Sequence, residues 1–467
     1  MGLEVHAELS TESKIFCGCK IDFGGEPNSR VCPVCSGMPG VLPKLNRSVV
    51  EYAVLAGIAL NCSIARKFKF DRKNYFYPDL PKAYQVSQLY MPVCTDGYIE
   101  LDSGKKINIR EIHIEEDAGK LTHDPLRGIT RMDFNRCGVP LIEIVSQPDF
   151  RSAGEVTAYL EKLQEILLYL NICDCRMHEG SLRVDVNLSV RREGGEPGVR
   201  TETKNLNSFK AIERAVKYET ARQIEILQDG GRVMQETRRW DDDKGASFAM
   251  RAKENAQDYR YFPEPDLLPV EIDDAWFEHI KSGIPELAQQ KRERYMREFN
   301  ITEYEAQVLT GDKNTADLFE RISKKSGEPK ETAHLIIGEV MRLANDMRPE
   351  DLNLDEQKLS YLIGLVLSGR INRTAYKEAV GAVLLHGAEP DEYIEKNGLL
   401  MMSDYNIIID AVNTVLAENT DAAAKYRRGK AKAFGFLMGQ IMKKLNGTGN
   451  PDMIKNALED ALMRGSF

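Results

Sequence analysis

Gly2-Leu-Glu-Val-His-Ala-Glu-Leu9 alternates apolar and polar residues along its whole length. Side chains in a strand switch faces at every residue, so this stretch predicts a β-strand with one apolar face. Its other face would carry two carboxylates beside an imidazole, from Glu4, His6 and Glu8. Grouped like charges repel unless a cation or a basic ligand compensates them, so this face is typical of a binding site. The alternative is an edge strand whose polar face meets solvent.

Three later stretches resemble the first. Residues 112–117 set His113 and Glu115 opposite two isoleucines, with Glu116 and Asp117 at the end of the predicted strand. Residues 182–190 alternate strictly, and residues 141–145 place Glu143 in an otherwise apolar strand, where an unpaired charge would cost several kcal/mol, roughly, and so needs a partner. Several acidic strand faces together favour a hard cation such as Mg²⁺, which prefers oxygen ligands and often acts with phosphates.

Length and composition are those of an ordinary non-membrane protein. The 467 residues allow about three domains. No apolar run approaches the roughly 20 residues of a membrane span, and no signal segment opens the chain, so we expect a cytoplasmic protein with no membrane partner. A net charge of −9 argues against indiscriminate nucleic-acid binding but allows a local basic patch.

Four of the nine cysteines form a distinct pattern. Cys17 and Cys19 are followed, after twelve residues, by Cys32 and Cys35, which is the spacing of a tetrahedral zinc site. We expect structural Zn²⁺, because four thiolates leave no open position. The alternative is a set of reduced thiols in a turn-rich loop.

The pattern along the chain predicts an α+β N-terminal domain followed by two all-α domains. Residues 1–283 mix strands with helices at residues 46–62, 152–171 and 211–229, and predict a curved, largely antiparallel sheet with a zinc-stapled loop. After that, alternation gives way to helical periods, which we divide into residues 284–398 and 399–467.

The last domain carries a basic cluster in an acidic chain. Residues 422–451 contain seven basic residues and no acidic ones. A solvated helix face usually mixes signs, so the pattern favours contact with a phosphate backbone. The residues predicted to bind the body of a nucleic acid are Lys425, Arg427, Arg428, Lys430 and Lys432.

Residues 71–88 interleave aromatic, basic and amide side chains around two prolines. Such a loop can stack an unpaired base while its cations meet phosphates, although a core-capping aromatic cluster is an equal alternative. Lys204, Arg238 and Arg239 are candidate phosphate clamps or, alternatively, solvated surface charges. No Walker A loop is present, so a nucleotide would have to bind on the sheet.

In this order, GLEVHAEL, FGGEPN, DRKNYFYPDLPKAYQ, HIEEDAGK, PLIEIVS, EGSLRVDVN, ETKNLNSF, QETRRW and DYRYFPEPDL closely resemble the B-subunit family of the tRNA-dependent aspartyl/glutamyl amidotransferases. GKAKAFGFLMGQIMK resembles the helical tail of the same family, a YqeY-like tRNA-binding domain, so the resemblance covers essentially the whole chain. Relatives usually have residues upstream of the first motif, whereas this sequence starts at Met1. We expect either a shortened first strand or a start further upstream.

The resemblance implies an ATP-dependent carbon–nitrogen ligase. Such a subunit phosphorylates the side-chain carboxylate of Glu-tRNA(Gln) or Asp-tRNA(Asn), and ammonia then displaces the phosphate. The chain has no glutaminase signature of its own, so the family resemblance implies a glutaminase A subunit that delivers ammonia and a small C subunit that braces the pair. A stand-alone small-molecule ligase and a non-catalytic, zinc-stabilised tRNA-binding subunit are the alternatives.

The resemblance also implies site residues, which we state as hypotheses. The predicted Mg²⁺ ligands are Glu4, His6, Glu115, Glu116 and Glu143. The predicted catalytic residues are Glu116, Arg183, Asp185, Asn187 and Lys204. The predicted ATP and phosphate contacts are Ser181, Arg183, Lys204, Asn205, Asn207, Arg238 and Arg239. The predicted contacts with the tRNA 3′ end are Asn74, Tyr75, Tyr77, Lys82, Tyr84 and Gln85.

Overall fold

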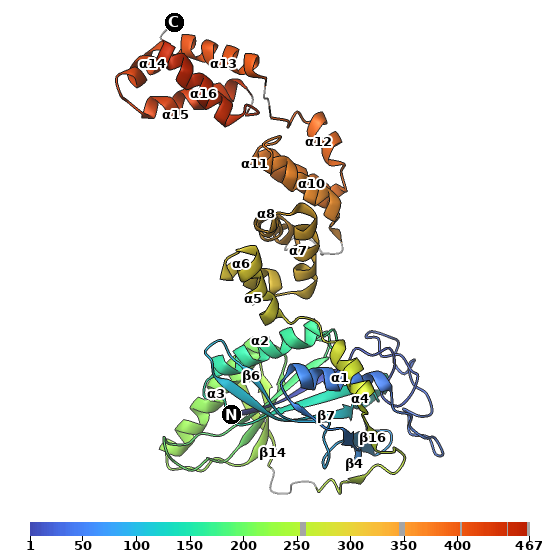
Figure 1. Ribbon diagram of the computed structural model, residues 1–467. Coiled ribbons are helices and arrows are strands. Elements are labelled where there is room, and N and C mark those ends of the chain that lie inside the picture. Colours follow the sequence, from blue (N-terminus) through green and yellow to red (C-terminus); the bar gives the residue numbers. More distant parts are fainter. Residues whose placement is uncertain (253–257, 345–350, 402–403, 446, 465–467) are drawn as a thin grey trace. The chain divides into compact units, whose positions relative to one another are not determined.

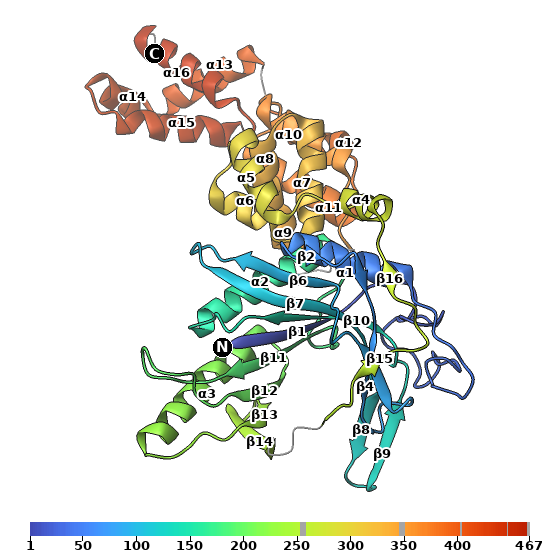
Figure 2. The same cartoon turned by 60° about the horizontal axis from the view of Figure 1, so that its bottom comes forward.

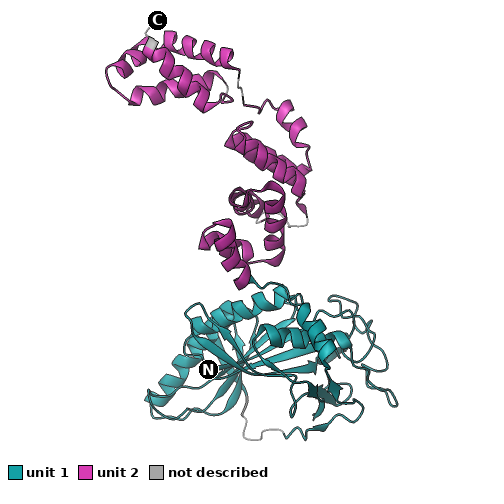
Figure 3. Ribbon diagram, in the orientation of Figure 1, with its two compact units in different colours: residues 1–288 teal, residues 289–467 magenta. Residues whose placement is uncertain are grey.

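The structure, a computed structural model, describes residues 1–252, 258–344, 351–401, 404–445 and 447–464. Contacts divide the chain into two compact units, residues 1–288 and residues 289–467 (Figure 3). The named strands of the described residues all lie in the first unit, and the second is built of helices (Figure 1).

Within the described residues, nine strands of the first unit form one sheet in the order β14-β13-β12-β11-β1-β10-β7-β6-β2 (Figure 2). Neighbouring strands are antiparallel except β12 and β13, which are parallel, so the predicted largely antiparallel sheet is confirmed. The strands are β1 (Gly2–Glu8), β2 (Ser63–Ile64), β6 (Cys94–Glu100), β7 (Lys106–Glu116), β10 (Pro140–Ser146), β11 (Leu182–Leu188), β12 (Thr201–Leu206), β13 (Glu236–Asp241) and β14 (Ala246–Ala252).

Smaller strand groups accompany this sheet. They are β15 (Phe262–Pro263) with β4 (Asp71–Asn74) and β5 (Tyr84–Ser87), β16 (Val270–Glu271) with β3 (Lys67–Phe68), and the hairpin of β8 (Lys120–Asp124) and β9 (Ile129–Asp133).

Three helices cover one face of the large sheet. They are α1 (Arg47–Ala59), α2 (Ala153–Tyr169) and α3 (Phe209–Gln228), and the shorter α4 (Asp274–Ser282) packs against α1. Each of the first three helices begins after an N-cap residue whose side chain accepts a backbone N–H of the first turn. These N-cap residues are Asn46, Ser152 and Ser208. The apolar residues of β1, β7 and β11 join these helices in one core. The three predicted helices and the apolar strand faces are therefore confirmed.

The first strand lies in the middle of the sheet, between β10 and β11. Its burial alternates residue by residue, as the sequence pattern predicts. The edge-strand alternative is wrong, because both sides of β1 carry hydrogen-bonded neighbours. The face opposite the helices therefore carries the polar residues of several strands, among them Glu4, Glu115 and Glu143. We call this side of the sheet the acidic face.

The second unit has two apolar cores, one between residues 295 and 394 and one between residues 408 and 462. The first involves α5 (Ala288–Phe299), α6 (Glu303–Thr310), α7 (Lys313–Ser326), α8 (Pro329–Leu335), the π-helical turn η1 (Ile336–Val340), α9 (Met341–Ala344), α10 (Glu356–Leu367), α11 (Arg373–His386) and α12 (Pro390–Lys396). The second involves α13 (Tyr405–Glu418), α14 (Thr420–Arg427), α15 (Lys432–Lys444) and α16 (Pro451–Arg464). Across the described ranges, we find no helix with the length and apolar character needed to span a bilayer.

Candidate active site

Strand register brings the central acidic residues together. His6 of β1 lies opposite Glu143 of β10, and Glu143 lies opposite His113 of β7. Cross-strand neighbours in an antiparallel sheet project to the same side, so these residues share the face that the helices leave uncovered. Residues far apart in the sequence thus meet because three strands are adjacent.

The first group on this face is His6, Glu115 and Glu143, whose ligand atoms all lie within 4.8 Å of one another. The Nε2 atom of His6 is 3.5 Å from Oε2 of Glu143. Ser87 donates its hydroxyl to Glu115 over 2.6 Å, which fixes that carboxylate. One imidazole and two carboxylates converging in this way fit a divalent cation.

His113 completes this group although it was not among the predicted ligands. Its Nε2 lies 2.8 Å from Glu143 and 3.2 Å from Glu115. Burial disfavours the charged imidazole, but the two carboxylates outweigh burial and raise the pKa of His113 to about 10. Burial likewise opposes the charge of Glu143, yet the contacts with His113 and His6 hold the pKa of Glu143 well below its usual range. The signal was present in the sequence, because His113 alternates in phase with Glu115.

A second group contains Glu4, Asp185 and Glu202, whose carboxylates also lie within 4.8 Å of one another. Lys204 bonds to Asp185 and lies 2.8 Å from Glu202. Asn187 donates its amide to Glu4 over 2.9 Å. The structure therefore separates Glu4 from the other predicted Mg²⁺ ligands and places it with the predicted catalytic residues.

A third group surrounds Arg183, which donates to Asp117 over 2.7 Å. Arg136 approaches the same carboxylate at 3.3 Å. Glu8 is half-buried beside Asp117, and desolvation followed by the charge of Asp117 raises the pKa of Glu8 to about 8. Glu8 and Asp117 were not predicted site residues, although both stood in the acidic motifs.

The remaining predicted phosphate contacts divide between the two faces. Arg239 lies opposite Lys204 in the parallel pair β12–β13, so it projects to the acidic face. Arg238, its neighbour, projects the other way and donates to Ser247 while lying 3.4 Å from the buried Glu219 of α3. Arg238 therefore lies on the face opposite to that of Lys204 and Arg239, because adjacent strand residues face opposite sides.

Of the three further predicted phosphate contacts, Ser181 and Asn207 lie in loops and Asn205 lies near the end of β12. The hydroxyl of Ser181 bonds to Asp174 and accepts the backbone N–H of Arg176, so it closes a loop. Asn205 has a left-handed backbone with φ of 66° and donates to the Trp240 carbonyl. Asn207 is exposed just before α3.

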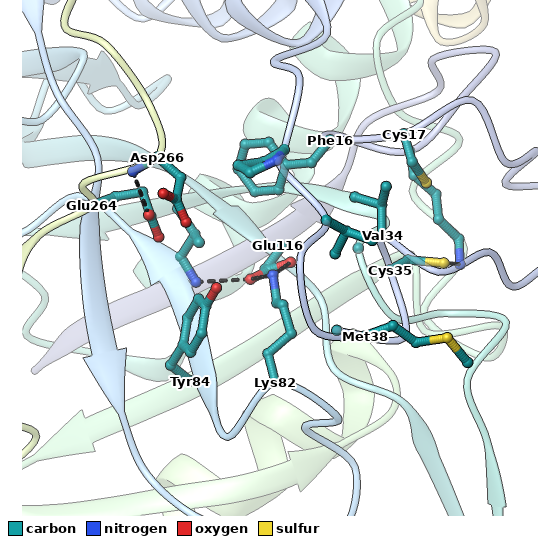
Figure 4. A pocket seen from close by; sticks show the side chains of 16 residues that line it. Phe16, Cys17, Val34, Cys35, Met38, Lys82, Tyr84, Glu116, Glu264 and Asp266 are labelled. Atoms are coloured by element: carbon teal, nitrogen blue, oxygen red, sulfur yellow. Dashed lines mark hydrogen bonds and ion pairs between the residues drawn. The ribbon is translucent and has the colours of Figure 1, made fainter.

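Glu116 is separated from the predicted Mg²⁺ ligands. Lys82 lies 2.7 Å from one carboxylate oxygen of Glu116, and the backbone N–H of Val86 donates to the other over 2.9 Å. This ion pair lines a pocket of about 110 Å³ that the cysteine loop borders on its far side (Figure 4). Glu116 follows Glu115 directly and so faces the opposite side of β7, apart from the group of His6, Glu115 and Glu143.

The four cysteines Cys17, Cys19, Cys32 and Cys35 come together as predicted, with their sulfur atoms within 4.8 Å of one another. The fully buried Lys14 donates to the sulfur of Cys35 at 3.5 Å. This donor set fits a tetrahedral thiolate-bound metal ion.

The aromatic loop is partly exposed and partly structural. Tyr77 is 55% exposed, whereas Tyr84 lies beneath the guanidinium of Arg72, which is 4.2 Å from the centre of its ring. Gln85 is buried and donates to Glu115 over 3.1 Å, so it braces the first acidic group. Asn74 and Tyr75 contact the segment around residue 259. Gln85 and Lys82 therefore do not lie in the exposed part of the loop: Gln85 contacts Glu115, and Lys82 pairs with Glu116.

The basic cluster of the second unit lies on α14, at the start of α15 and between them. The five predicted side chains, Lys425, Arg427, Arg428, Lys430 and Lys432, are all exposed.

Comparison with known proteins defines the class first. The family described as "GatB/GatE catalytic domain" matches residues 1–278, and the family described as "GatB domain" matches residues 317–462. Together they match most of each unit, and the chain therefore belongs to the GatB family.

Individual relatives indicate the particular subunit that this chain resembles. A protein of Lachnoclostridium phytofermentans is 55% identical over 471 residues, which cover 99% of this chain and 98% of the relative. Relatives from Caldicellulosiruptor bescii and from Thermoanaerobacter sp. are 53% and 49% identical, with 99% of this chain covered and 98% and 99% of the relative respectively. Each of the three is named as the B subunit of an aspartyl/glutamyl-tRNA(Asn/Gln) amidotransferase.

Proposed function

We propose that the acidic face of the large sheet is the site at which this chain uses ATP to activate the side-chain carboxylate of aminoacyl-tRNA. The chain is a subunit of an aspartyl/glutamyl-tRNA(Asn/Gln) amidotransferase, a glutamine-hydrolysing ligase of protein biosynthesis. The convergence of His6, Glu115 and Glu143 on one polar sheet face is the observation that carries this assignment.

The chemistry follows from the weakness of a carboxylate as an electrophile. One carboxylate oxygen attacks the γ-phosphorus of ATP, and ADP leaves. Ammonia then attacks the carbonyl carbon, and phosphate departs with that carboxylate oxygen. Phosphoryl transfer depends chiefly on positioning and on neutralising charge.

The residues of the acidic face supply both requirements. Arg183 and Lys204 carry positive charge to a face otherwise rich in carboxylates. Arg239 lies beside Lys204 in the neighbouring strand. We assign these three side chains to the phosphates and to the substrate carboxylate, since fixed cations stabilise charge that is already in place when the reactants bind. Asp185 and Asn187 position Lys204 and Glu4.

His6, Glu115 and Glu143 would hold Mg²⁺, which would supply positive charge against the phosphate oxygens. His113 then acts as a positioning residue for the two carboxylates. Glu4 belongs to the neighbouring group with Asp185. Zinc at the four cysteines would be structural, because a closed four-thiolate site offers no position for a substrate.

The partners are also part of the proposal. A glutaminase A subunit would deliver ammonia, and a small C subunit would brace the pair. The basic cluster of the second unit would hold the tRNA body, since exposed point charges bind phosphates without reading sequence. We place the assembled enzyme in the cytoplasm.

Amidation assays with free ammonium test this function. The assembled enzyme, with ATP and Mg²⁺, should amidate Glu-tRNA(Gln) or Asp-tRNA(Asn) but not free glutamate. The Glu143→Gln variant should lose at least a hundredfold in rate because it removes a ligand on which the transition state depends. Amidation of free glutamate would indicate a small-molecule ligase instead, and binding of tRNA without any amidation would indicate a non-catalytic subunit.

A further inference from the structure

Three tyrosines from two distant segments form a wall beside the acidic face. Tyr75 and Tyr259 meet edge to face with ring centres 5.7 Å apart, and Tyr259 and Tyr261 meet in the same way at 6.1 Å. We call Tyr75, Tyr259 and Tyr261 the tyrosine wall. The sequence predicted no site residue in the 258–261 segment, because nothing local ties it to residue 75.

The tyrosine wall lies next to the predicted Mg²⁺ ligands. Burial, followed by the charges of Glu115 and Glu143, raises the pKa of Tyr261. Burial, followed by the charges of Asp79 and Glu115, raises the pKa of Tyr75. The strand pairing gives the same neighbourhood: Lys73, two residues before Tyr75, lies opposite Gln85 of β5, and Gln85 donates to Glu115 over 3.1 Å. The end of β4 that carries Tyr75 therefore borders the acidic face.

A rigid frame holds the wall in place. The backbone N–H of Asn74 donates to the Tyr259 carbonyl over 2.9 Å, and the Asn74 amide donates to the Arg260 carbonyl over 2.8 Å. The following residues pair with β4 as strand β15, and Arg72 binds Glu264 through two hydrogen bonds of 2.7 and 2.9 Å. The rings are therefore arranged before any ligand arrives, which limits the entropy lost on binding.

A cation accompanies the rings. The Nζ atom of Lys73 lies 5.1 Å from the centre of the Tyr259 ring and 5.9 Å from that of Tyr75. Aromatic faces beside a lysine are the combination that binds an unpaired base together with its phosphate.

The covalent structure of the aminoacyl-tRNA determines which base can lie at the tyrosine wall. The side-chain carboxylate that reacts is joined to the terminal ribose of the tRNA through the aminoacyl ester, only a few bonds away. When that carboxylate lies at the acidic face, the terminal nucleotide must lie beside it. Adenine is also the base of ATP, so the test must distinguish the two ligands.

We propose that the tyrosine wall stacks the 3′-terminal adenine of the aminoacyl-tRNA, with Lys73 against the terminal phosphate. This inference rests on the proposed function and adds Tyr259 and Tyr261 as positioning residues for the tRNA substrate. Stacking on an aromatic ring tolerates loss of a hydroxyl but not loss of the ring.

The experiment measures steady-state amidation by the assembled enzyme with free ammonium. Tyr259→Ala and Tyr261→Ala should each raise KM for Glu-tRNA(Gln) roughly tenfold and leave KM for ATP unchanged. Tyr259→Phe should behave as the wild type. Tyr98→Ala is the matched control, because Tyr98 is also half-buried, with Lys106 4.1 Å from its ring centre, but lies on β6.

A competition assay isolates the terminal base. Uncharged tRNA(Gln) with its 3′-terminal adenosine should inhibit the wild type about ten times more strongly than the same tRNA without that nucleotide. The Tyr259→Ala enzyme should lose this difference, and Tyr259→Phe should keep it.

Three results would overturn the inference. A difference between the two tRNAs that survives in both alanine variants would exclude stacking of the terminal base. A rise in KM for ATP with KM for tRNA unchanged would assign the wall to the nucleotide instead. A wild-type enzyme that fails to amidate tRNA would contradict the proposed function itself, whereas an active wild type with unaffected variants contradicts the tyrosine wall alone.

Discussion

Glu115 and Glu116 are adjacent in the sequence, yet their carboxylates meet different partners. Glu115 joins His6 and Glu143, whereas Glu116 forms an ion pair with Lys82. Strand alternation implies this separation, because neighbouring strand residues face opposite sides, although the predicted ligand set included both glutamates. The same rule separates Arg238 from Arg239. What the sequence did not contain was the register that sets His6 against Glu143, since that depends on which strands become neighbours.

This separation predicts different Mg²⁺ dependence for the two glutamates. Glu115→Gln removes a carboxylate ligand and should raise the Mg²⁺ concentration needed for half-maximal amidation at least tenfold. Glu116→Gln should leave that concentration unchanged, whatever it does to the rate. Titration of amidation with Mg²⁺ at saturating ATP distinguishes them, and equal shifts in both variants would return Glu116 to the metal site.

Helix α3 is tied to the sheet by a buried carboxylate. Glu219 is 1% exposed and accepts from Thr201 of β12, from Arg222 and from Gln223. Burial opposes its charge, but these hydrogen bonds outweigh burial and lower the pKa of Glu219. A lowered pKa stabilises the fold above the unfolded value of about 4.5, and that contribution is lost as the pH falls.

Glu219→Gln should therefore lower the free energy of unfolding near neutral pH by about 3 kcal/mol, since it leaves Arg222 and Arg238 without their buried partner. Below pH 4.5 the wild type should lose stability more steeply than the variant, because the variant has no such carboxylate to protonate. Urea unfolding of both proteins from pH 7 to pH 3 measures how steeply the free energy of unfolding of each protein changes with pH. Parallel curves would show that Glu219 contributes nothing through its charge.

The cysteine loop, residues 9–46, contains no named helix or strand, so it needs another source of rigidity. Cys32→Ser should reduce bound zinc from about one ion per chain to almost none and lower the melting temperature of the protein. Cys62→Ser is the control, because Cys62 lies outside the four-cysteine group. Zinc is measured by atomic emission on the purified chain, and full retention of zinc by the Cys32 variant would contradict the site.

Over the whole chain, the features that could be predicted are those with a local sequence signal. The alternation of β1 and the cysteine spacing were enough to foresee the sheet and the four-sulfur group, because both signals are local. The tyrosine wall was not foreseeable, because Tyr75 and Tyr259 meet only through the pairing of β4 with β15. The prediction of two helical domains in the second unit stays a prediction, although that unit has two apolar cores.

The basic cluster predicts a salt-dependent contribution to tRNA affinity. Replacing Lys425, Arg427, Arg428, Lys430 and Lys432 with glutamine should weaken tRNA binding and flatten the slope of log affinity against log salt by roughly 3 to 4. The maximal rate at saturating tRNA should not change, because the cluster holds the tRNA body only. Filter binding at several salt concentrations gives the slope, and an unchanged slope would remove the cluster from the tRNA interface.

The central claim is that this sheet face makes an acyl phosphate from the substrate carboxylate. The most direct measurement uses Glu-tRNA(Gln) labelled with ¹⁸O in its side-chain carboxylate, with ATP, Mg²⁺ and ammonium. The account predicts that the wild-type enzyme transfers one ¹⁸O atom to each inorganic phosphate as Gln-tRNA(Gln) forms, and that Glu143→Gln forms neither product. Amidation without ¹⁸O in the phosphate, or transfer by the Glu143 variant at the wild-type rate, would contradict it.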